Sequence, residues 1–143
     1  MSDAKIDLDS LDEASRLQME RMLADKFICG LVGIRLIEAR DGRACAELEL
    51  REDHMNGLGI CQGGVLFSLS DYALAAAFNY KSEPVASLNV SIEFCKAVSS
   101  GVLCAEAVET FRSRTTTLGD VVVKNEKDEV ICHARGRGYI FRS

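Results

Sequence analysis

The sequence predicts an α+β protein in which an antiparallel sheet of about six strands wraps around one long apolar helix. Three observations predict it: a helical pattern near the N-terminus, an apolar helical segment at residues 62–80, and alternating strand patterns on both sides of that segment. Short polar turns separate the strands, which favours antiparallel pairing. Such a sheet must bury one face, and the apolar helix is the segment that it would wrap around.

The N-terminal segment is expected to form an amphipathic helix over residues 11–28. Its apolar side chains recur near helical spacing, and acidic side chains gather at its start. We expect Asp9 or Ser10 to cap the first turn and Gly30 to end the helix.

Two strands are expected next, at residues 31–38 and 44–50. Asp41-Gly42 lies between them and is typical of a hairpin turn. Apolar and acidic side chains alternate in the second strand, which predicts one buried and one exposed face. The buried set is Ala46, Leu48 and Leu50, and the exposed set is Glu47 and Glu49.

The segment 62–80 is predicted to be a central buried helix, because it is apolar nearly all round and rich in small side chains. A glycine-bearing loop at 53–60 precedes it. Asp71 is the one charged residue between His54 and Tyr80. Burying a lone carboxylate in such a helix costs free energy unless a partner group compensates the charge. A carboxylate in this setting usually has a catalytic or binding role.

The chain after Pro84 is expected to be strand. Alternating patterns and intervening turn residues place four strands at 86–95, 102–112, 115–124 and 129–141. In the last of these, His133, Arg135 and Arg137 share one face.

The length of 143 residues favours one domain over the whole chain, and the net charge of −5 argues against a general nucleic-acid binder. No apolar run reaches the roughly 18 residues of a membrane span, and the acidic N-terminus lacks the features of a signal peptide. We therefore expect a cytoplasmic protein that binds neither nucleic acid nor membrane.

Six widely spaced cysteines form no CxxC pair, so we expect reduced, mostly buried thiols and no disulfide framework. No zinc site is expected, because the two histidines form no ligand cluster. Residues 112–143 carry seven basic and four acidic side chains. This surplus is either chance variation on solvated strands or a basic patch for a phosphate-bearing ligand.

Two glycines, Gly63 and Gly64, stand at the expected start of the central helix. The first N–H groups of a helix lack intrahelical partners, so they can hold an oxyanion or a polarised carbonyl group. With Asp71 as acid, base or nucleophile, the segment indicates carbonyl chemistry at a helix N-terminus.

The pattern H-x-N-x-x-G-x-x-Q-G-G at residues 54–64, followed by Asp71, resembles the hotdog-fold thioesterases. It is most similar to the group of the phenylacetate-degradation and 4-hydroxybenzoyl-CoA thioesterases. The segments PVASLNVSIEF and GDVVVKNEKDEVICHARGRGYI are similar to the family's strand after the central helix and to its last hairpin. The likeness covers roughly residues 27–141.

The resemblance implies the hotdog fold and an acyl-CoA thioesterase whose only coenzyme is the coenzyme A of its substrate, without a metal. It also implies a homodimer with active sites at the interface, and leaves open whether dimers pair into a homotetramer. Asn56 and Gly63 of one subunit would face the partner's Asp71 and Ser87.

Each catalytic role is implied by the resemblance and has a simpler structural alternative. The Gly63 N–H would polarise the thioester carbonyl, or the glycine only serves a tight turn. Asp71 would attack the thioester or activate a water, or it is an interface aspartate that only caps or hydrogen-bonds the structure. Asn56 would help to place the carboxylate, the water or the substrate, or it is only a turn residue. Ser87 would orient the attacking water, or it is an ordinary strand serine. Gln62 stands where the family usually has histidine, and it does not titrate near neutral pH.

Further candidates for substrate binding are Gly64, His54, Arg135 and Arg137. The simpler interpretation of His54, beside Asp53, is a solvated loop histidine. Arg135 and Arg137, like Arg112 and Arg114, are candidates for the phosphates of coenzyme A, with surface solvation as the simpler interpretation.

An apolar acyl group, aromatic or aliphatic, is expected to occupy a tunnel walled by Leu58, Phe67, Phe78 and Tyr80, with the N-terminal helix over its mouth. The alternative function is a non-catalytic acyl-CoA-binding protein, which Gln62 motivates. A hotdog dehydratase fits poorly, because Ala76 stands where those enzymes carry a histidine.

Overall fold

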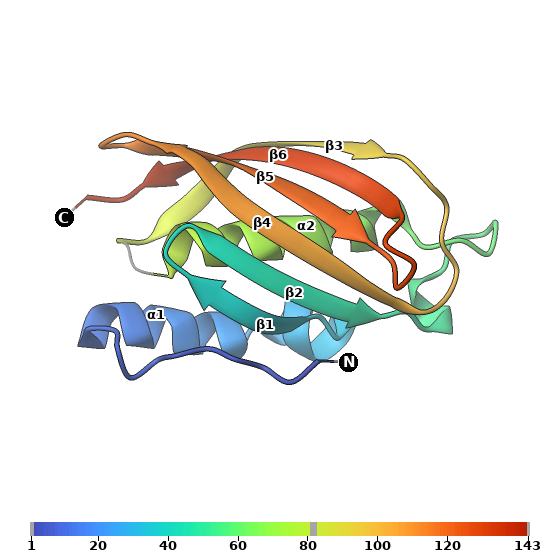
Figure 1. Cartoon of the computed structure of the whole chain (residues 1–143), viewed down its shortest axis with the longest axis horizontal. Helices are drawn as coiled ribbons and strands as arrows, with labels where there is room; N and C mark the ends of the chain where they lie inside the picture. The colour runs from blue at the N-terminus through green and yellow to red at the C-terminus, as the bar shows by residue number, and fades with distance from the viewer. Residues whose placement is uncertain (1, 81–82, 143) are drawn as a thin grey trace.

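The computed structural model describes residues 2–80 and 83–142, and it confirms the predicted α+β architecture. Six strands form one antiparallel sheet in the order β1-β2-β4-β5-β6-β3, which curves around the long helix α2 (Figure 1). The elements are α1 Glu13–Leu23, the π-helical turn η1 Lys26–Val32, β1 Arg35–Arg40, β2 Arg43–Glu49, the short 3-10 turn η2 Glu52–His54, α2 Gly63–Asn79, β3 Val85–Phe94, β4 Val102–Arg112, β5 Thr116–Lys124 and β6 Val130–Ile140.

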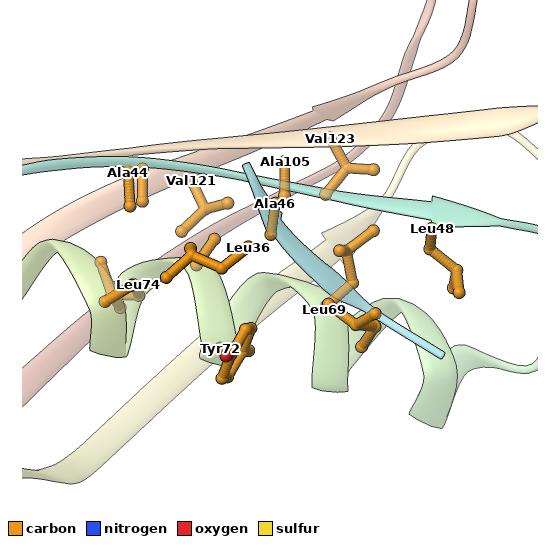
Figure 2. Close-up of a cluster of buried hydrophobic side chains, with 14 of the residues drawn as sticks. Leu36, Ala44, Ala46, Leu48, Leu69, Tyr72, Leu74, Ala105, Val121 and Val123 are labelled. Carbon is orange, nitrogen blue, oxygen red and sulfur yellow. The ribbon is translucent and has the colours of Figure 1, made fainter. Parts of the chain in front are cut away.

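The core lies between α2 and the concave face of the sheet. Leu69 and Leu74 of α2 are fully buried against the inward side chains of the strands (Figure 2). Most of those strand residues are small or β-branched, as are Ala44, Ala46, Ala105, Val121 and Val123, and Leu48 joins them. This packing explains the apolar composition of α2, since most of its circumference is removed from water.

Close approach between α2 and the sheet depends on a strand glycine as well as on the small residues of the helix. A Cβ atom at Gly119 would lie 2.8 Å from Leu74 Cδ1 and 2.8 Å from the Val108 carbonyl oxygen. Because the second of these atoms belongs to the backbone, the space cannot be recovered by a side-chain rotation.

The N-terminal helix begins and ends elsewhere than the sequence predicts. Asp12 caps α1 by accepting a hydrogen bond from Ser15 N at 2.8 Å, and the helix ends at Ala24. Asp25 then accepts from Ile28 N at 2.8 Å and starts η1, which Gly33 ends with a φ of 88°. The predicted caps Asp9, Ser10 and Gly30 are therefore wrong. The first strand starts at Arg35 and not at residue 31, because residues 31 and 32 belong to η1.

A β-bulge in β3 decides where Ser87 points. Strict alternation along the sequence would place Ser87 on the face of Asn89. In the structure Ser87 pairs with Gly138 and Asn89 with Arg137, so Leu88 is the extra residue. The bulge turns Ser87 toward α2, on the same side of the sheet as Val90.

The two edges of the sheet differ. The N-terminal segment covers β1 through a bridge between Lys5 and Glu38, with Lys5 N bonded to Ile37 O at 2.6 Å. In the described part of the chain no strand pairs with the outer edge of β3, which is ten residues long. The described residues also contain no helix that is long and apolar enough to cross a membrane.

Two predictions about burial are wrong. Glu47, expected to be exposed, is buried and accepts a hydrogen bond from Ser2 N at 3.0 Å. The six cysteines are free thiols, but only Cys61 and Cys132 are buried. Alternating patterns identify the inward face of each strand, but they do not show which outward positions a neighbouring segment covers.

We expect Gly119→Ala to destabilise the protein by about 1–3 kcal/mol, because the added methyl group forces the strand away from α2 or β4. Urea unfolding followed by circular dichroism measures this change. Gly30→Ala is the control and should change the free energy of unfolding by less than about 0.5 kcal/mol, since a Cβ there has no atom within 4 Å. Equal effects of the two substitutions would contradict the packing account.

Candidate active site

Asp71 lies on the side of α2 that the sheet leaves uncovered. Its carboxylate is half-buried and accepts a hydrogen bond from Ser87 Oγ at 3.0 Å on Oδ1. It lines a cavity of about 1030 Å³ whose walls come from α1, α2 and the start of β3. The bulge in β3 makes this contact possible, because it turns the Ser87 hydroxyl toward the helix.

The environment of Asp71 makes its carboxylate more basic than usual. Burial raises the pKa of Asp71, and the hydrogen bond from Ser87 opposes part of that rise. A desolvated carboxylate with a raised pKa binds a proton more readily, and a general base benefits from this property. The second oxygen, Oδ2, remains for a water or a substrate atom.

A second cavity, of about 280 Å³, lies at the N-terminus of α2 and is lined by Asn56, Gly63 and Phe94. The carbonyl oxygen of Gln62 accepts hydrogen bonds from the N–H groups of Val65 and Leu66. The N–H groups of Gly63 and Gly64 have no acceptor among the described residues. These N–H groups are therefore free to donate to an acceptor atom of a ligand.

Gly63 is constrained by its neighbour. A Cβ there would lie 3.1 Å from the ring of Phe94, whereas one on Gly64 would meet open space. Glycine at position 63 therefore leaves the backbone of the first helical turn approachable from the cavity.

Asn56 and Gln62 both contribute to the loop before α2. Asn56 Oδ1 accepts from Leu58 N at 2.9 Å and from Ile60 N at 3.3 Å, so its side-chain oxygen holds the turn. Gln62 N donates to His54 O at 2.8 Å, while the exposed Gln62 side chain makes no capping bond. Asn56 combines a turn role with a place in the cavity wall.

His54 is buried, so the interpretation as a solvated loop histidine is wrong. Its Nδ1 accepts from Arg51 N at 3.1 Å, which leaves Nε2 to donate to Val32 O at 2.7 Å. Both ring nitrogens are therefore engaged by the backbone, and His54 ties the loop to η1.

Arg135 and Arg137 lie on the face of β6 that points away from α2, with side chains exposed to solvent. Arg135 is held by Asp120, with Nε 2.8 Å from Oδ1. Within a single chain these guanidinium groups lie on the other side of the sheet from Asp71.

The predicted site thus occupies two separate places in one chain. Asp71 contacts Ser87, and Asn56 lines one cavity with Gly63, but the two cavities share no lining residue. Asp71 follows Gly63 by eight residues on one helix, which places them roughly 12 Å apart along its axis. One thioester carbonyl therefore cannot meet both Gly63 and Asp71 within a single chain.

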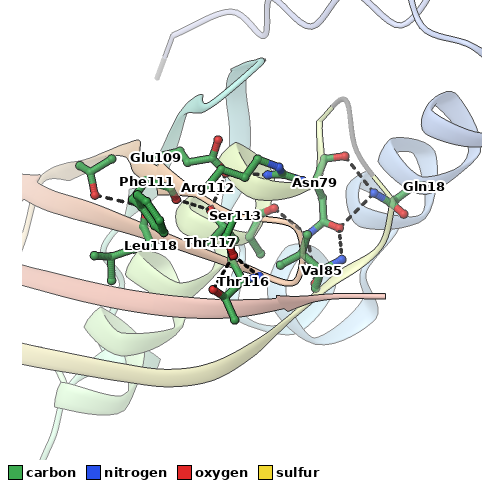
Figure 3. A network of polar contacts seen from close by, with 12 residues as sticks. Gln18, Asn79, Val85, Glu109, Phe111, Arg112, Ser113, Thr116, Thr117 and Leu118 are labelled. Carbon is green, nitrogen blue, oxygen red and sulfur yellow. Dashed lines mark hydrogen bonds and ion pairs between the residues drawn. The ribbon is translucent and has the colours of Figure 1, made fainter. Parts of the chain in front are cut away.

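Asn79 is a residue of the site that the sequence reasoning missed. Its Oδ1 accepts from Val85 N at 2.8 Å and from Gln18 Nε2 at 3.0 Å, and its Nδ2 donates to Ala75 O (Figure 3). Asn79 therefore joins α1, α2 and β3, the three elements that wall the cavity beside Asp71. A polar residue at the end of an apolar helical run was the available signal.

The predicted tunnel wall is wrong for Phe78 and Tyr80, whereas Leu58 and Phe67 are exposed and stay a prediction. Phe78 and Tyr80 are buried in the core, and Leu58 is 84% exposed. The apolar part of the cavity beside Asp71 is instead lined by Leu17, Met22, Ile28, Tyr72, Ala75 and Val85. Helices α1 and α2 therefore supply most of the apolar lining of this cavity. No group of three or more metal-ligating side chains occurs among the described residues.

A curved antiparallel sheet wrapped around one long helix is the hotdog fold, which a class of thioester hydrolases shares. The sequence model of the thioesterase superfamily matches residues 58–132, and the chain belongs to that superfamily.

Three relatives document this membership. One from Archaeoglobus fulgidus, provisionally named an esterase, is 34% identical over 110 residues, which are 76% of this chain and 71% of the relative. The acyl-coenzyme A thioesterase PaaI of Escherichia coli K12 is 28% identical in sequence, over 76% of this chain and 78% of PaaI. The structure of E. coli PaaI superposes on this chain with a TM-score of 0.84. The two are 24% identical over the superposed residues, which cover 94% of this chain and 98% of the PaaI chain. The TT0310 protein of Thermus thermophilus superposes with a TM-score of 0.77, at 28% identity over 82% and 98%.

We expect Asp71→Asn to stabilise the folded protein at neutral pH. Because the folded-state pKa of Asp71 is raised, the carboxylate costs stability once the pH exceeds its unfolded pKa of about 4. The gain in Tm should therefore be present at pH 7 and fade as the pH falls toward that value. The exposed Asp53→Asn is the control and should leave Tm nearly unchanged at both pH values. A lower Tm of Asp71→Asn at pH 7 would contradict the burial account.

Proposed function

We propose that this thioester hydrolase acts on acyl-CoA with an apolar acyl group, and that Asp71 is its catalytic carboxylate. The observation that carries the proposal is the half-buried Asp71, bonded to Ser87 and facing a large, partly apolar cavity. The names of its relatives, which include an acyl-coenzyme A thioesterase, support coenzyme A as the thiol part of the substrate.

In the proposed reaction, Asp71 takes a proton from a water that attacks the thioester carbon. The carbonyl oxygen becomes an oxyanion, which the Gly63 N–H and the helix N-terminus stabilise. The tetrahedral intermediate then collapses, and the thiolate of coenzyme A leaves. Direct attack by Asp71 on the thioester carbon would instead give a mixed anhydride, which water then hydrolyses. Both routes need the carboxylate close to the thioester carbon, and neither uses a metal.

The cavity beside Asp71 supports an apolar acyl group. Met22 and Ile28 of the N-terminal segments line it together with Tyr72 and Ala75 of α2. Helix α1 therefore forms a wall of the acyl site, and we propose that it restricts the shape of the acyl group that is accepted.

A second copy of the chain completes the proposed site. Strand β3 ends the sheet with a ten-residue edge that carries one charge, Glu93, and such an edge is a template for pairing with another strand. Pairing of two β3 strands about a twofold axis would extend the sheet and bring Gly63 and Asn56 of one subunit toward the partner's Asp71 and Ser87.

The alternative is a non-catalytic acyl-CoA-binding protein, and Gln62 is the observation that favours it. Glutamine cannot supply a titrating group where related sequences usually have histidine. In the structure the Gln62 side chain is exposed and makes no capping bond, so its contribution to the site rests on its backbone. We therefore favour hydrolysis.

We expect Asp71→Asn to lower kcat by about 10²–10⁴-fold on a panel of short, long and aromatic acyl-CoAs, because the amide can neither accept the proton nor attack. Loss of thioester absorbance or mass spectrometry measures hydrolysis; a thiol dye would react with the protein's own cysteines. The control, Gln62→His, should stay within about threefold of wild type. Negligible turnover by wild type and Asp71→Asn alike, with measurable acyl-CoA binding, would establish the binder instead.

A further inference from the structure

Cys45 of β2 and Cys104 of β4 form a pair on the face of the sheet opposite α2. Their sulfur atoms are 2.9 Å apart, although the residues are separated by 59 positions in the chain. In both strands the flanking alanines and leucines are buried against the helix, whereas both thiols are half-exposed on the outer face. The pair therefore lies away from the cavity that contains Asp71.

The register shows how the two thiols meet. Cys45 lies opposite Glu106, and Cys104 lies opposite Glu47, so the two cysteines are diagonal neighbours across the antiparallel pair. Closing the gap to the length of a disulfide needs a movement of about 1 Å. A diagonal bridge spans more backbone than one between directly opposite residues, which makes such a bond easier to reduce.

A cavity of about 320 Å³ opens beside Cys104 and not beside Cys45. Its walls include Glu106 and Lys124, and Lys124 lies directly opposite Cys104 on β5. A small molecule that enters this cavity meets Cys104 first, with the Cys45 thiol behind it.

The two thiols share a hydrogen bond in which either sulfur can be the donor. This hydrogen bond lowers the pKa of Cys104 and raises that of Cys45, while the carboxylates Glu47 and Glu106 act against ionisation of both thiols. Cys104 is therefore the better nucleophile, and Cys45 holds its proton until that bond is broken. By contrast, burial raises the pKa of Cys61 to about 11.

We propose that Cys45 and Cys104 are a redox modification site that closes to a reversible disulfide by exchange with low-molecular-weight disulfides. The Cys104 thiolate attacks one sulfur of the small disulfide, forms a mixed disulfide and expels the first small thiolate. Cys45 loses its proton to that thiolate and attacks the Cys104 sulfur, which expels the second. Two protein thiols are oxidised, and one small disulfide is reduced to two thiols.

The test uses the folded full-length chain and oxidised glutathione, followed by alkylation of free thiols and tryptic digestion without reductant. Cleavage at the flanking basic residues places Cys45 in peptide 44–51 and Cys104 in peptide 97–112. We expect these two peptides to be linked, the intact mass to fall by two hydrogen atoms, and dithiothreitol to reverse both. The link should form at least about tenfold faster in folded than in urea-unfolded protein, since the fold holds the thiols together.

Two variants separate this order of events from general thiol reactivity. Cys45→Ser should trap glutathione on Cys104, because the second attack is lost, and Cys95→Ser should keep the link, because that exposed thiol lies elsewhere. Absence of the 44–51 to 97–112 link, adducts on Cys95 alone, or equal rates in folded and unfolded protein would overturn the proposal. None of these readouts depends on hydrolysis, so the result stands apart from the proposed function.

Discussion

The rest of the structure depends on the burial of α2 by the sheet on all but one side. The sheet can wrap this closely because small and β-branched residues face the helix, and because Gly119 has no side chain to hold Leu74 away. The uncovered side is where Asp71 lies, between α1 and the start of β3. The hydrophobic core therefore determines the position of the carboxylate, and its partial burial gives the carboxylate its raised pKa.

The same helix carries both parts of the proposed chemistry, and its rigidity keeps them apart. Gly63 lies in the first turn and Asp71 two turns later, so the proposed oxyanion-binding end and the proposed catalytic carboxylate do not meet in one chain. The free edge of β3 offers a route to a second copy, and the bulge at Leu88 turns Ser87 toward Asp71 on the same strand. Asn79 joins that strand to both helices.

Much of the fold could be predicted from the sequence, because the apolar run of α2 has clear boundaries and the strands alternate apolar and polar side chains. Some failures are local, where another side chain caps the helix, and others occur where the strand register departs from simple alternation. Asp12 and Asp25 displaced the predicted caps, and the bulge at Leu88 shifts the alternation by one residue. For the site, the motif predicted candidate residues, and the structure places Asp71 beside Ser87. The motif could not show that His54 is buried or that α1 walls the cavity, since both depend on segments far apart in sequence.

The most direct test of a site shared between two copies mixes two inactive variants. Gly63→Val blocks the N-terminus of α2 and Asp71→Asn removes the carboxylate, so each protein alone should be nearly inactive. After unfolding and refolding together at equal amounts, half of the dimers are hybrids, and each hybrid has one site with neither substitution. The account predicts recovery of about one quarter of the wild-type rate. No recovery, from variants that each fold and assemble, would contradict it.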